Sequence, residues 1–378
     1  MSSWWVMLPW RRFQPTRMGG RRKGVNCIRN EVPRTRCEGI DGSLVVVGAL
    51  RTRHRPGSTR KSYPSTAGTI SSAPTTPINL MLFDTHTNLM WYPDHLSEEF
   101  VQLGWEAKKA KMKLTPDVYF AGKENPENNA FDSRPEQLLE ATSECDKIIV
   151  FGIQAPFCGI RADQQLIAKF VQEHSDRFIG WCSVDPNDAD CVEQLEHYVN
   201  DLGLRGLKCS PIYQNWDPQD PQHLPLFCKA EQLGIPVNIH QGTSFVRPGP
   251  LKFANPILLE DIAIACPDLR IVIAHMGHPW EDECVVLIRK HPNLYSNISA
   301  LHYRPLRHYQ AFMSAIEYGV EHKLIFGSDF PSATPAQVIS GQEKINNIVQ
   351  GTNLPKIPEE MIHNIIYENW KQFLPEHV

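Results

Sequence analysis

The chain has 378 residues, 42% of them hydrophobic, and its 38 Lys+Arg against 42 Asp+Glu give a formal net charge of -4. This charge disfavours a nucleic-acid-binding protein, which is usually basic, and the hydrophobic content is sufficient for a large core. No stretch of 18 apolar residues occurs, so the sequence predicts no membrane span. The ten cysteines include no C-x-x-C pair and indicate a reduced, cytoplasmic protein.

The first 80 residues differ in composition from the rest of the chain. They hold 14 Lys+Arg and 3 Asp+Glu, and 16 of the 22 residues from Pro56 to Pro77 are Ser, Thr, Pro or Gly. Such a stretch cannot bury enough apolar surface to offset its chain entropy, so we expect residues 1–79 to be a disordered, basic, Ser/Thr/Pro-rich extension. An organelle transit peptide and a nucleic-acid or membrane arm are alternatives. We favour an over-extended start, with the working protein beginning near Met81.

From residue 80 onward, short apolar runs alternate with longer amphipathic stretches. The runs are rich in Val, Ile, Leu and Phe and nearly continuous, which is typical of parallel strands covered on both faces. Eight strands are predicted, at 80–85, 147–153, 178–184, 204–209, 235–240, 270–275, 293–299 and 323–328.

Helical segments are predicted after the strands, at 163–175, 188–202, 221–233, 256–266, 280–290, 309–318, 335–349 and 358–373. The stretch 97–135 is an insertion after the first strand, with its own helix near 97–112 and a polar part, 124–129, that is a candidate lid. Eight strand–helix units predict an α/β fold, a (β/α)₈ TIM-type barrel, over residues 80–376. An open doubly wound sheet is the alternative, but no glycine-rich phosphate loop follows the first strand.

Polar residues stand at the ends of these strands, where a barrel of this kind keeps its active site. Side chains alternate along a strand, so His86 and Asn88 share one face. The later strands end in Lys208, His240 and His275, and Asp329 follows the last one. Imidazole and carboxylate groups from several strands would then meet at one rim, and these groups bind divalent transition ions.

The short motifs that contain these strand-end residues resemble, in their order and spacing, those of the amidohydrolase superfamily. Within it they resemble the amidohydrolase 2 group, which includes aminocarboxymuconate semialdehyde decarboxylase. The resemblance covers about residues 80–375. It is carried by Asp-Thr-His86-Thr-Asn88, Gly-Leu-Lys208, Val-Asn-Ile-His240, Ala-His275-Met-Gly and Gly-Ser-Asp329-Phe-Pro.

The resemblance implies one divalent ion, often zinc, bound by His86, His240 and Asp329, with His275 either ligating the ion or orienting a metal-bound water. Asn88 stands where the family has a second histidine of a His-x-His pair. Its amide oxygen can bind an ion, but it is neutral and weaker toward zinc than imidazole. We therefore expect a weakened zinc site that includes Asn88.

Such a site predicts a metal-dependent hydrolase that acts on a small carboxylated amide, lactone or cyclic substrate. A bound ion acidifies water toward neutral pH, and Asp329 would take the water's proton. The alternative is a non-oxidative decarboxylase of an aromatic or muconate-type acid. A metal-free lactonase or a non-catalytic barrel is the second alternative.

Five further residues are candidates for substrate binding. Lys208 can pair with a substrate carboxylate, or equally with a buried aspartate of the barrel. Tyr213 and Trp216 follow the fourth strand and can form the wall of a site for a flat substrate. Tyr303 and Arg304 follow the seventh strand, and Arg304 is a candidate bidentate partner for a carboxylate. We expect a small-molecule substrate, no nucleic-acid or membrane partner, and an architecture compatible with a homodimer.

Overall fold

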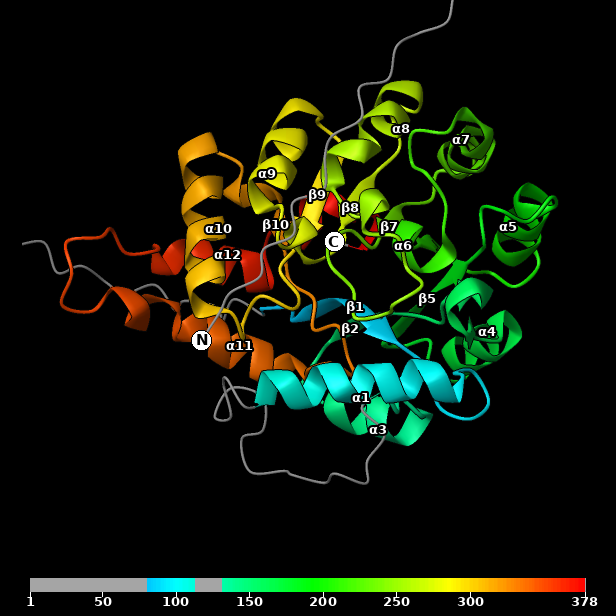
Figure 1. Cartoon of the computed structure of the whole chain (residues 1–378), viewed down its shortest axis with the longest axis horizontal. Coiled ribbons are helices and arrows are strands. Elements are labelled where there is room, and N and C mark those ends of the chain that lie inside the picture. Colours follow the sequence, from blue (N-terminus) through cyan, green and yellow to red (C-terminus); the bar gives the residue numbers. More distant parts are fainter. Residues whose placement is uncertain (1–79, 113–130, 378) are drawn as a thin grey trace, which may run out of the picture. The chain divides into compact units, whose positions relative to one another are not determined.

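The computed structural model describes residues 80–112 and 131–377. Eight parallel strands form one sheet in the order β1-β2-β5-β6-β7-β8-β9-β10 (Figure 1). The predicted barrel is confirmed, although most strands are shorter than predicted. The strands are β1 (Phe83–Asn88), β2 (Lys147–Phe151), β5 (Phe178–Ser183), β6 (Leu207–Cys209), β7 (Val237–Ile239), β8 (Ile271–Ile273), β9 (Leu294–Asn297) and β10 (Leu324–Ile325).

The sheet closes between its last and first strands. The amide of Thr85 donates to the carbonyl of Phe326 at 3.3 Å, and the amide of Asn88 donates to that of Phe330 at 2.9 Å. Between these two bonds, the amide of Asp329 donates to the carbonyl of His86 at 2.8 Å. The seam that closes the barrel therefore also places Asp329 beside His86.

Helices surround the barrel (Figure 1). They are α1 (Glu98–Met112), α3 (Pro135–Ala141), α4 (Gln164–Glu173), α5 (Cys191–Asn200), α6 (Pro211–Gln214), α7 (Leu224–Gln232), α8 (Glu260–Ala265), α9 (Glu281–Lys290), α10 (Pro305–Tyr318), α11 (Pro335–Glu343), α12 (Glu359–Tyr367) and α13 (Trp370–Phe373). A small hairpin of β3 (Gln154–Ala155) and β4 (Ile160–Arg161) follows β2. The predicted helix at 358–373 is interrupted because the Asn369 side chain donates to the carbonyls of Glu321 and Leu324.

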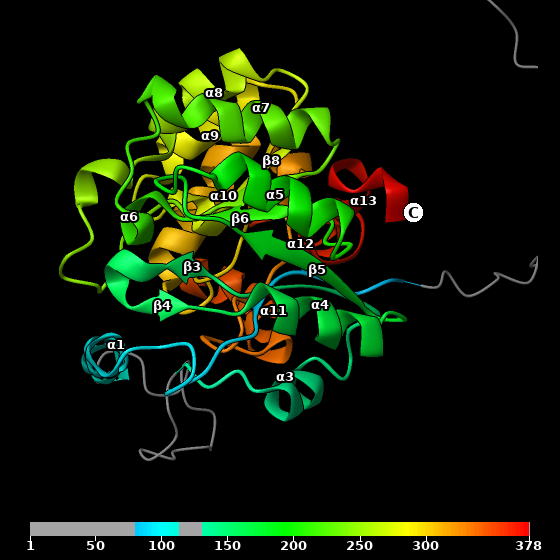
Figure 2. The same ribbon diagram turned by 90° about the vertical axis from the view of Figure 1, so that its right-hand side faces the viewer.

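The C-terminal helix α13 covers the amino ends of the strands. Trp370 packs on Phe83 with ring centroids 5.0 Å apart, and Phe373 packs on Tyr295 at 5.3 Å. Arg270, just before β8, donates to the carbonyl of Phe373 at 2.8 Å. In Figure 2, α13 lies on the side away from the point of β5, whereas α1 and α6 lie on the side toward which β5 points. That second side is where the cavity opens.

The helix predicted within the insertion is confirmed as α1. The candidate lid at 124–129 and the extension at 1–79 lie outside the described residues. Among the helices that the structure describes, none has both the length and the apolar character to cross a membrane.

Candidate active site

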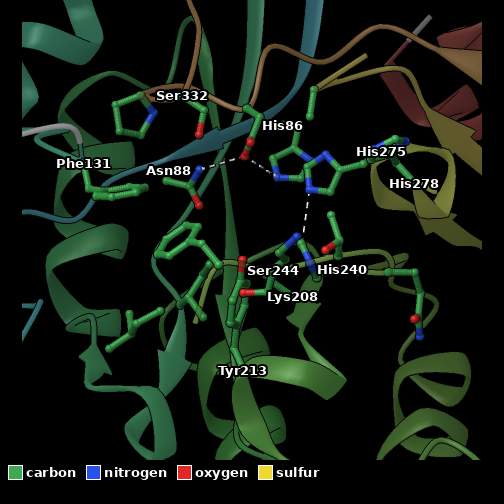
Figure 3. Close-up of a pocket in the computed structure, with 18 of the residues that line it drawn as sticks. His86, Asn88, Phe131, Lys208, Tyr213, His240, Ser244, His275, His278 and Ser332 are labelled. Atoms are coloured by element: carbon green, nitrogen blue, oxygen red, sulfur yellow. Dashed lines mark hydrogen bonds and ion pairs between the residues drawn. The ribbon is translucent and has the colours of Figure 1, made fainter. Parts of the chain in front are cut away.

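A cavity of about 270 Å³ lies at the carboxyl ends of the strands (Figure 3). The cavity therefore lies where barrels of this kind keep their active site, at the carboxyl ends of the strands. The residues predicted for the site that line this cavity are His86, Asn88, Lys208, Tyr213, His240, His275, Tyr303, Arg304 and Asp329.

Trp216 is the predicted substrate-binding residue that the structure does not bring to the cavity. It is 1% exposed, and its ring packs on Phe227 at 5.5 Å and on His223 at 5.3 Å. The preceding Asn215 has a left-handed backbone with φ of 56°, which ends α6 and turns the chain away from the cavity. Trp216 thereby becomes part of the hydrophobic core beneath α7.

The centre of the site is a cluster of His86, His275 and Asp329. One potential ligand atom from each lies within 4.8 Å of the other two. His86 Nε2 is 3.3 Å from Asp329 Oδ1, and both histidines are buried. His240 joins through His275, with His240 Nδ1 3.2 Å from His275 Nε2 (Figure 3). The Nε2 atom of His240 is buried and has no hydrogen-bond partner.

The backbone is strained where it delivers these side chains. His275, Ala300 and Asp329 have φ values of 60°, 62° and 61°, in the left-handed region that non-glycine residues rarely adopt. Such conformations persist only where the surrounding structure fixes them, and they cluster at functional sites. At Asp329, the left-handed conformation is fixed by the hydrogen bond from its amide to the carbonyl of His86 across the barrel seam.

Burial keeps the site histidines neutral. It lowers the pKa of His86 and His275 well below the ordinary value, and that of His240 to about 3. The nearby Lys208 cation lowers all three pKa values further. Neutral imidazole is the form that binds a metal ion, so the protonation state suits one.

Lys208 lies fully buried at the base of the site. Its Nζ donates to Asn238 Oδ1 at 2.7 Å and lies 4.7 Å from the centre of the Phe151 ring. Among the described residues, no carboxylate forms an ion pair with it within 4.0 Å. Burial lowers the pKa of Lys208 to about 7, so it changes charge near neutral pH.

Asn297, at the end of β9, connects the two cluster histidines and was not singled out in the sequence. Its Oδ1 accepts from the amide of His275 at 3.1 Å and from Ser299 Oγ at 2.6 Å. Ser299 Oγ therefore accepts from His275 Nδ1, 2.7 Å away, so His275 Nε2 carries no proton and accepts from His240 Nδ1. The Asn297 Nδ2 donates to His86 Nδ1 at 2.9 Å, so the ring proton of His86 is on Nε2, facing Asp329. The signal that could have indicated Asn297 is its position two residues before Ser299, which places both side chains on the same face of the strand.

Asn88 presents its amide nitrogen, rather than its oxygen, to Asp329. The Nδ2 atom donates to the carbonyl of Phe330 at 2.8 Å. It also lies 3.5 Å from Asp329 Oδ1, an interaction drawn as a dashed line in Figure 3. The carbonyl bond fixes this orientation of the amide. Asn88 therefore positions Asp329 in this structure.

The donor chemistry fits a divalent ion. His86, His275 and Asp329 supply two imidazoles and a carboxylate, and His240 adds a buried nitrogen without a partner. His275 also donates its second ring N–H to a fixed acceptor, as metal-binding histidines usually do. His86 departs from this rule, because Asn297 donates to its Nδ1 and the ring proton is on Nε2. An ion could bind His86 Nε2 only after that proton moved to Nδ1.

The comparisons with known proteins identify the family. A family model described as Amidohydrolase matches residues 83–374, and the chain belongs to that family. It is 24% identical over 143 residues to γ-resorcylate decarboxylase of Rhizobium sp. (strain MTP-10005), covering 31% of this chain and 44% of that protein. It is 29% identical over 140 residues to dihydroorotase of Helicobacter pylori (strain ATCC 700392 / 26695), covering 35% and 40%. The chain thus spans less than half the length of either relative, and the predicted resemblance is confirmed at the level of the family.

Solved structures share the fold. The uncharacterised TIM-barrel protein Bb4693 of Bordetella bronchiseptica superposes with a TM-score of 0.60 at 18% identity, covering 79% of this chain and 99% of that one. A dihydroxybenzoic acid decarboxylase of Polaromonas sp. JS666, solved with manganese and 2-nitroresorcinol, gives 0.53 at 16%, covering 79% and 98%. The 5-carboxyvanillate decarboxylase of Sphingomonas paucimobilis gives 0.51 at 16%, covering 78% and 99%.

Proposed function

We propose that the protein is a metal-dependent, non-oxidative decarboxylase of a small hydroxylated aromatic acid. The observation that carries this proposal is the His86–His275–Asp329 cluster, whose two histidines are buried and which opens into a cavity that also contains Lys208 and Arg304. The match to γ-resorcylate decarboxylase favours this alternative over the hydrolase predicted first.

We assign a divalent ion to His86, His275 and Asp329, with His240 beside them. Zinc was the ion expected from the sequence, and the manganese in the Polaromonas decarboxylase makes Mn²⁺ the first ion to test. When bound, such an ion supplies positive charge that holds substrate oxygens and stabilises negative charge developing on the ring.

The chain's own cations orient the acid. The Arg304 guanidinium lies 4.2 Å from the centre of the Tyr303 ring and donates to the carbonyl of Ala300. This arrangement holds it at the rim, where it can bind a carboxylate or phenolate oxygen. Lys208 adds charge at the base of the site. Tyr213 packs over the His240 ring at 4.8 Å and forms one side of the cavity.

Asp329 is the group to which we assign the proton transfer. In the reaction, the bond between the ring carbon and the carboxyl carbon breaks, carbon dioxide leaves, and the electron pair stays on the ring carbon. Asp329 takes the proton of the substrate's hydroxyl group and gives it to that carbon, and the resulting phenolate takes a proton from water afterwards. The bonds from His86 and Asn88 hold the Asp329 carboxyl in place for this transfer.

Hydrolysis is the second candidate, supported by the match to dihydroorotase. The same test separates the two reactions. The full chain, loaded with Mn²⁺ or treated with a chelator, is incubated with 2,6-dihydroxybenzoate, 5-carboxyvanillate, dihydroorotate and 2-pyrone-4,6-dicarboxylate. We expect metal-dependent release of carbon dioxide from a hydroxylated benzoate. Ring opening of the cyclic substrates without carbon dioxide release would contradict the proposal and favour the hydrolase.

A further inference from the structure

The end of the cavity away from the histidines is lined by phenylalanine rings. Phe100, Phe131 and Phe245 line it together, and their centroids lie 5.2, 5.4 and 5.4 Å apart pairwise. Rings at these separations are in contact. Figure 3 shows Phe131 across the cavity from His275. We call these three residues the phenylalanine wall.

Aliphatic side chains extend the apolar surface beside the wall. Met90, Ile153 and Ile160 also line the cavity, and they belong to the same hydrophobic cluster as the three rings. The charged lining residues Lys208, Arg304 and Asp329 stand instead at or after strand ends. The cavity therefore has one end suited to a charged group and one end suited to an apolar group.

The wall is built by the insertion and one loop. Phe100 is on α1, Phe131 lies just before α3, and Phe245 is on the loop after β7. The same helix and loop are joined at the surface by Arg247 and Glu106, whose Nη2 and Oε2 atoms are 3.2 Å apart. The insertion thus supplies two rings of the wall and contacts the third.

Gly104 on α1 makes room for the Phe131 ring. A Cβ atom added at Gly104 would overlap that ring, so the aromatic side chain lies directly against the helix backbone. Because the backbone at Gly104 is helical, an alanine there fits the helix and moves only the ring. This position allows the wall to be displaced without removing any phenylalanine.

The size of the cavity also points to more than one small ring. An apolar cavity of about 150 Å³ is sufficient to bind benzene. The cavity here measures about 270 Å³, so a single-ring acid held at the histidine end leaves space in front of the wall. Filling that space with an apolar group removes its surface from water and stabilises the complex.

From this geometry, we propose that the phenylalanine wall is a binding subsite for an apolar or aromatic substituent carried by the substrate opposite its reacting carboxyl. The preferred substrate would then be a fused-ring or alkyl- or aryl-substituted hydroxy acid rather than a simple benzoate. The orientation of the substrate rests on the proposed function; the apolar subsite itself does not.

The test uses the full chain and two pairs of probes that differ by one fused ring. Phenol and 2-naphthol, which carry no carboxylate, are titrated by calorimetry. We expect 2-naphthol to bind on the order of tenfold more tightly than phenol, as burial of a second ring would give. Metal-dependent decarboxylation of 2,6-dihydroxybenzoate and 1,3-dihydroxy-2-naphthoate is measured in parallel, with a higher kcat/KM expected for the naphthoate.

Three variants locate the preference. Phe245→Ala removes one ring of the wall, and Gly104→Ala displaces another; both should reduce the 2-naphthol preference to below roughly threefold. Phe157→Ala is the matched control, because Phe157 is exposed and does not line the cavity; it should leave the preference unchanged. Equal binding of the two alcohols, or a preference that survives both wall variants, would overturn the subsite. A wall-dependent preference without any decarboxylation would support the subsite and refute the proposed reaction.

Discussion

Asp329 carries two functions in the proposed site, because its carboxylate belongs to the ion-binding cluster and is also the proton carrier. We expect Asp329→Asn to reduce turnover by about 10²- to 10⁴-fold even at saturating Mn²⁺, because an amide cannot transfer the proton. Carbon dioxide release is the measurement. Asp94→Asn, at a residue that does not line the cavity, is the control. Retention of more than about a tenth of the activity would mean that another residue transfers the proton.

Asn297 sets the tautomer of His86 and therefore its readiness to bind an ion. An aspartate in its place would accept a hydrogen bond from His86 Nδ1, which moves the ring proton there and frees Nε2. We expect Asn297→Asp to raise Mn²⁺ affinity by about tenfold, measured by competition with a coloured chelator. Asn293→Asp adds the same charge near the other end of β9 and should have little effect. An unchanged affinity in Asn297→Asp would show that His86 does not bind the ion through Nε2.

Alternation along β1 and the positions of strand ends predicted nine of the 22 residues that line the cavity, including all of its charged and imidazole groups except His278. This reasoning did not predict the orientation of the Asn88 amide or the position of the Trp216 side chain. The orientation of the Asn88 amide depends on the Phe330 carbonyl, which is 242 positions away in the chain, and no local pattern encodes that contact. The direction of Trp216 depends on a left-handed residue, Asn215, that ends a four-residue helix. Asn297 was missed because this strand was predicted to extend to residue 299, whereas β9 ends at Asn297.

At the scale of elements, the order of strands and helices follows from the sequence, but their limits do not. The predicted helix at 335–349 is divided into α11 and a 3₁₀ turn at Ile345–Val349. The sequence also does not show the contacts between neighbouring helices. These contacts decide how the free energy of unfolding depends on pH. The pairing of α10 with α11 is an example.

His308 on α10 is buried against Gln342 on α11, with its Nε2 atom 2.9 Å from Gln342 Oε1. Burial lowers the pKa of His308 to about 4, whereas the unfolded chain has an ordinary histidine near 6.5. Between pH 6.5 and pH 4 the unfolded chain therefore binds more protons, and the free energy of unfolding falls as the pH falls. The contribution of His308 to this fall is about 3 kcal/mol.

His308→Gln removes the titrating group but keeps a side chain that can bond to Gln342. We expect its free energy of unfolding, measured by urea titration from pH 4 to pH 7, to fall less steeply toward low pH than that of the unchanged protein. His363→Gln, on the exposed face of α12, is the matched control and should follow the unchanged protein. Parallel curves for His308→Gln and the unchanged protein would show that the acid sensitivity arises elsewhere.

At the scale of the whole molecule, the two ends of the barrel have different tasks. One end carries the cavity, the cluster and the phenylalanine wall. The other end is filled by α13, whose aromatic rings pack on Phe83 and Tyr295. The homodimer expected from the sequence stays a prediction. The division between a binding end and a stabilising end predicts that stability can be changed without changing the site.

Trp370→Ala tests this division. Trp370 is 1% exposed and packs against Phe83 on β1, so its removal leaves a large cavity at the closed end of the barrel. We expect the free energy of unfolding to fall by about 3–5 kcal/mol, because a buried tryptophan loses both its transfer free energy and its packing contacts. Urea denaturation measures this loss. The neighbouring Lys371→Ala removes a partly exposed ion pair with Glu368 and a cation–π contact of 5.9 Å with the Trp370 ring, and should cost less than about 1 kcal/mol. At temperatures where the Trp370→Ala variant stays folded, its KM and its Mn²⁺ affinity should equal those of the unchanged protein, since the cavity lies at the other end of the strands. A change in either would show that packing at the closed end sets the geometry of the site.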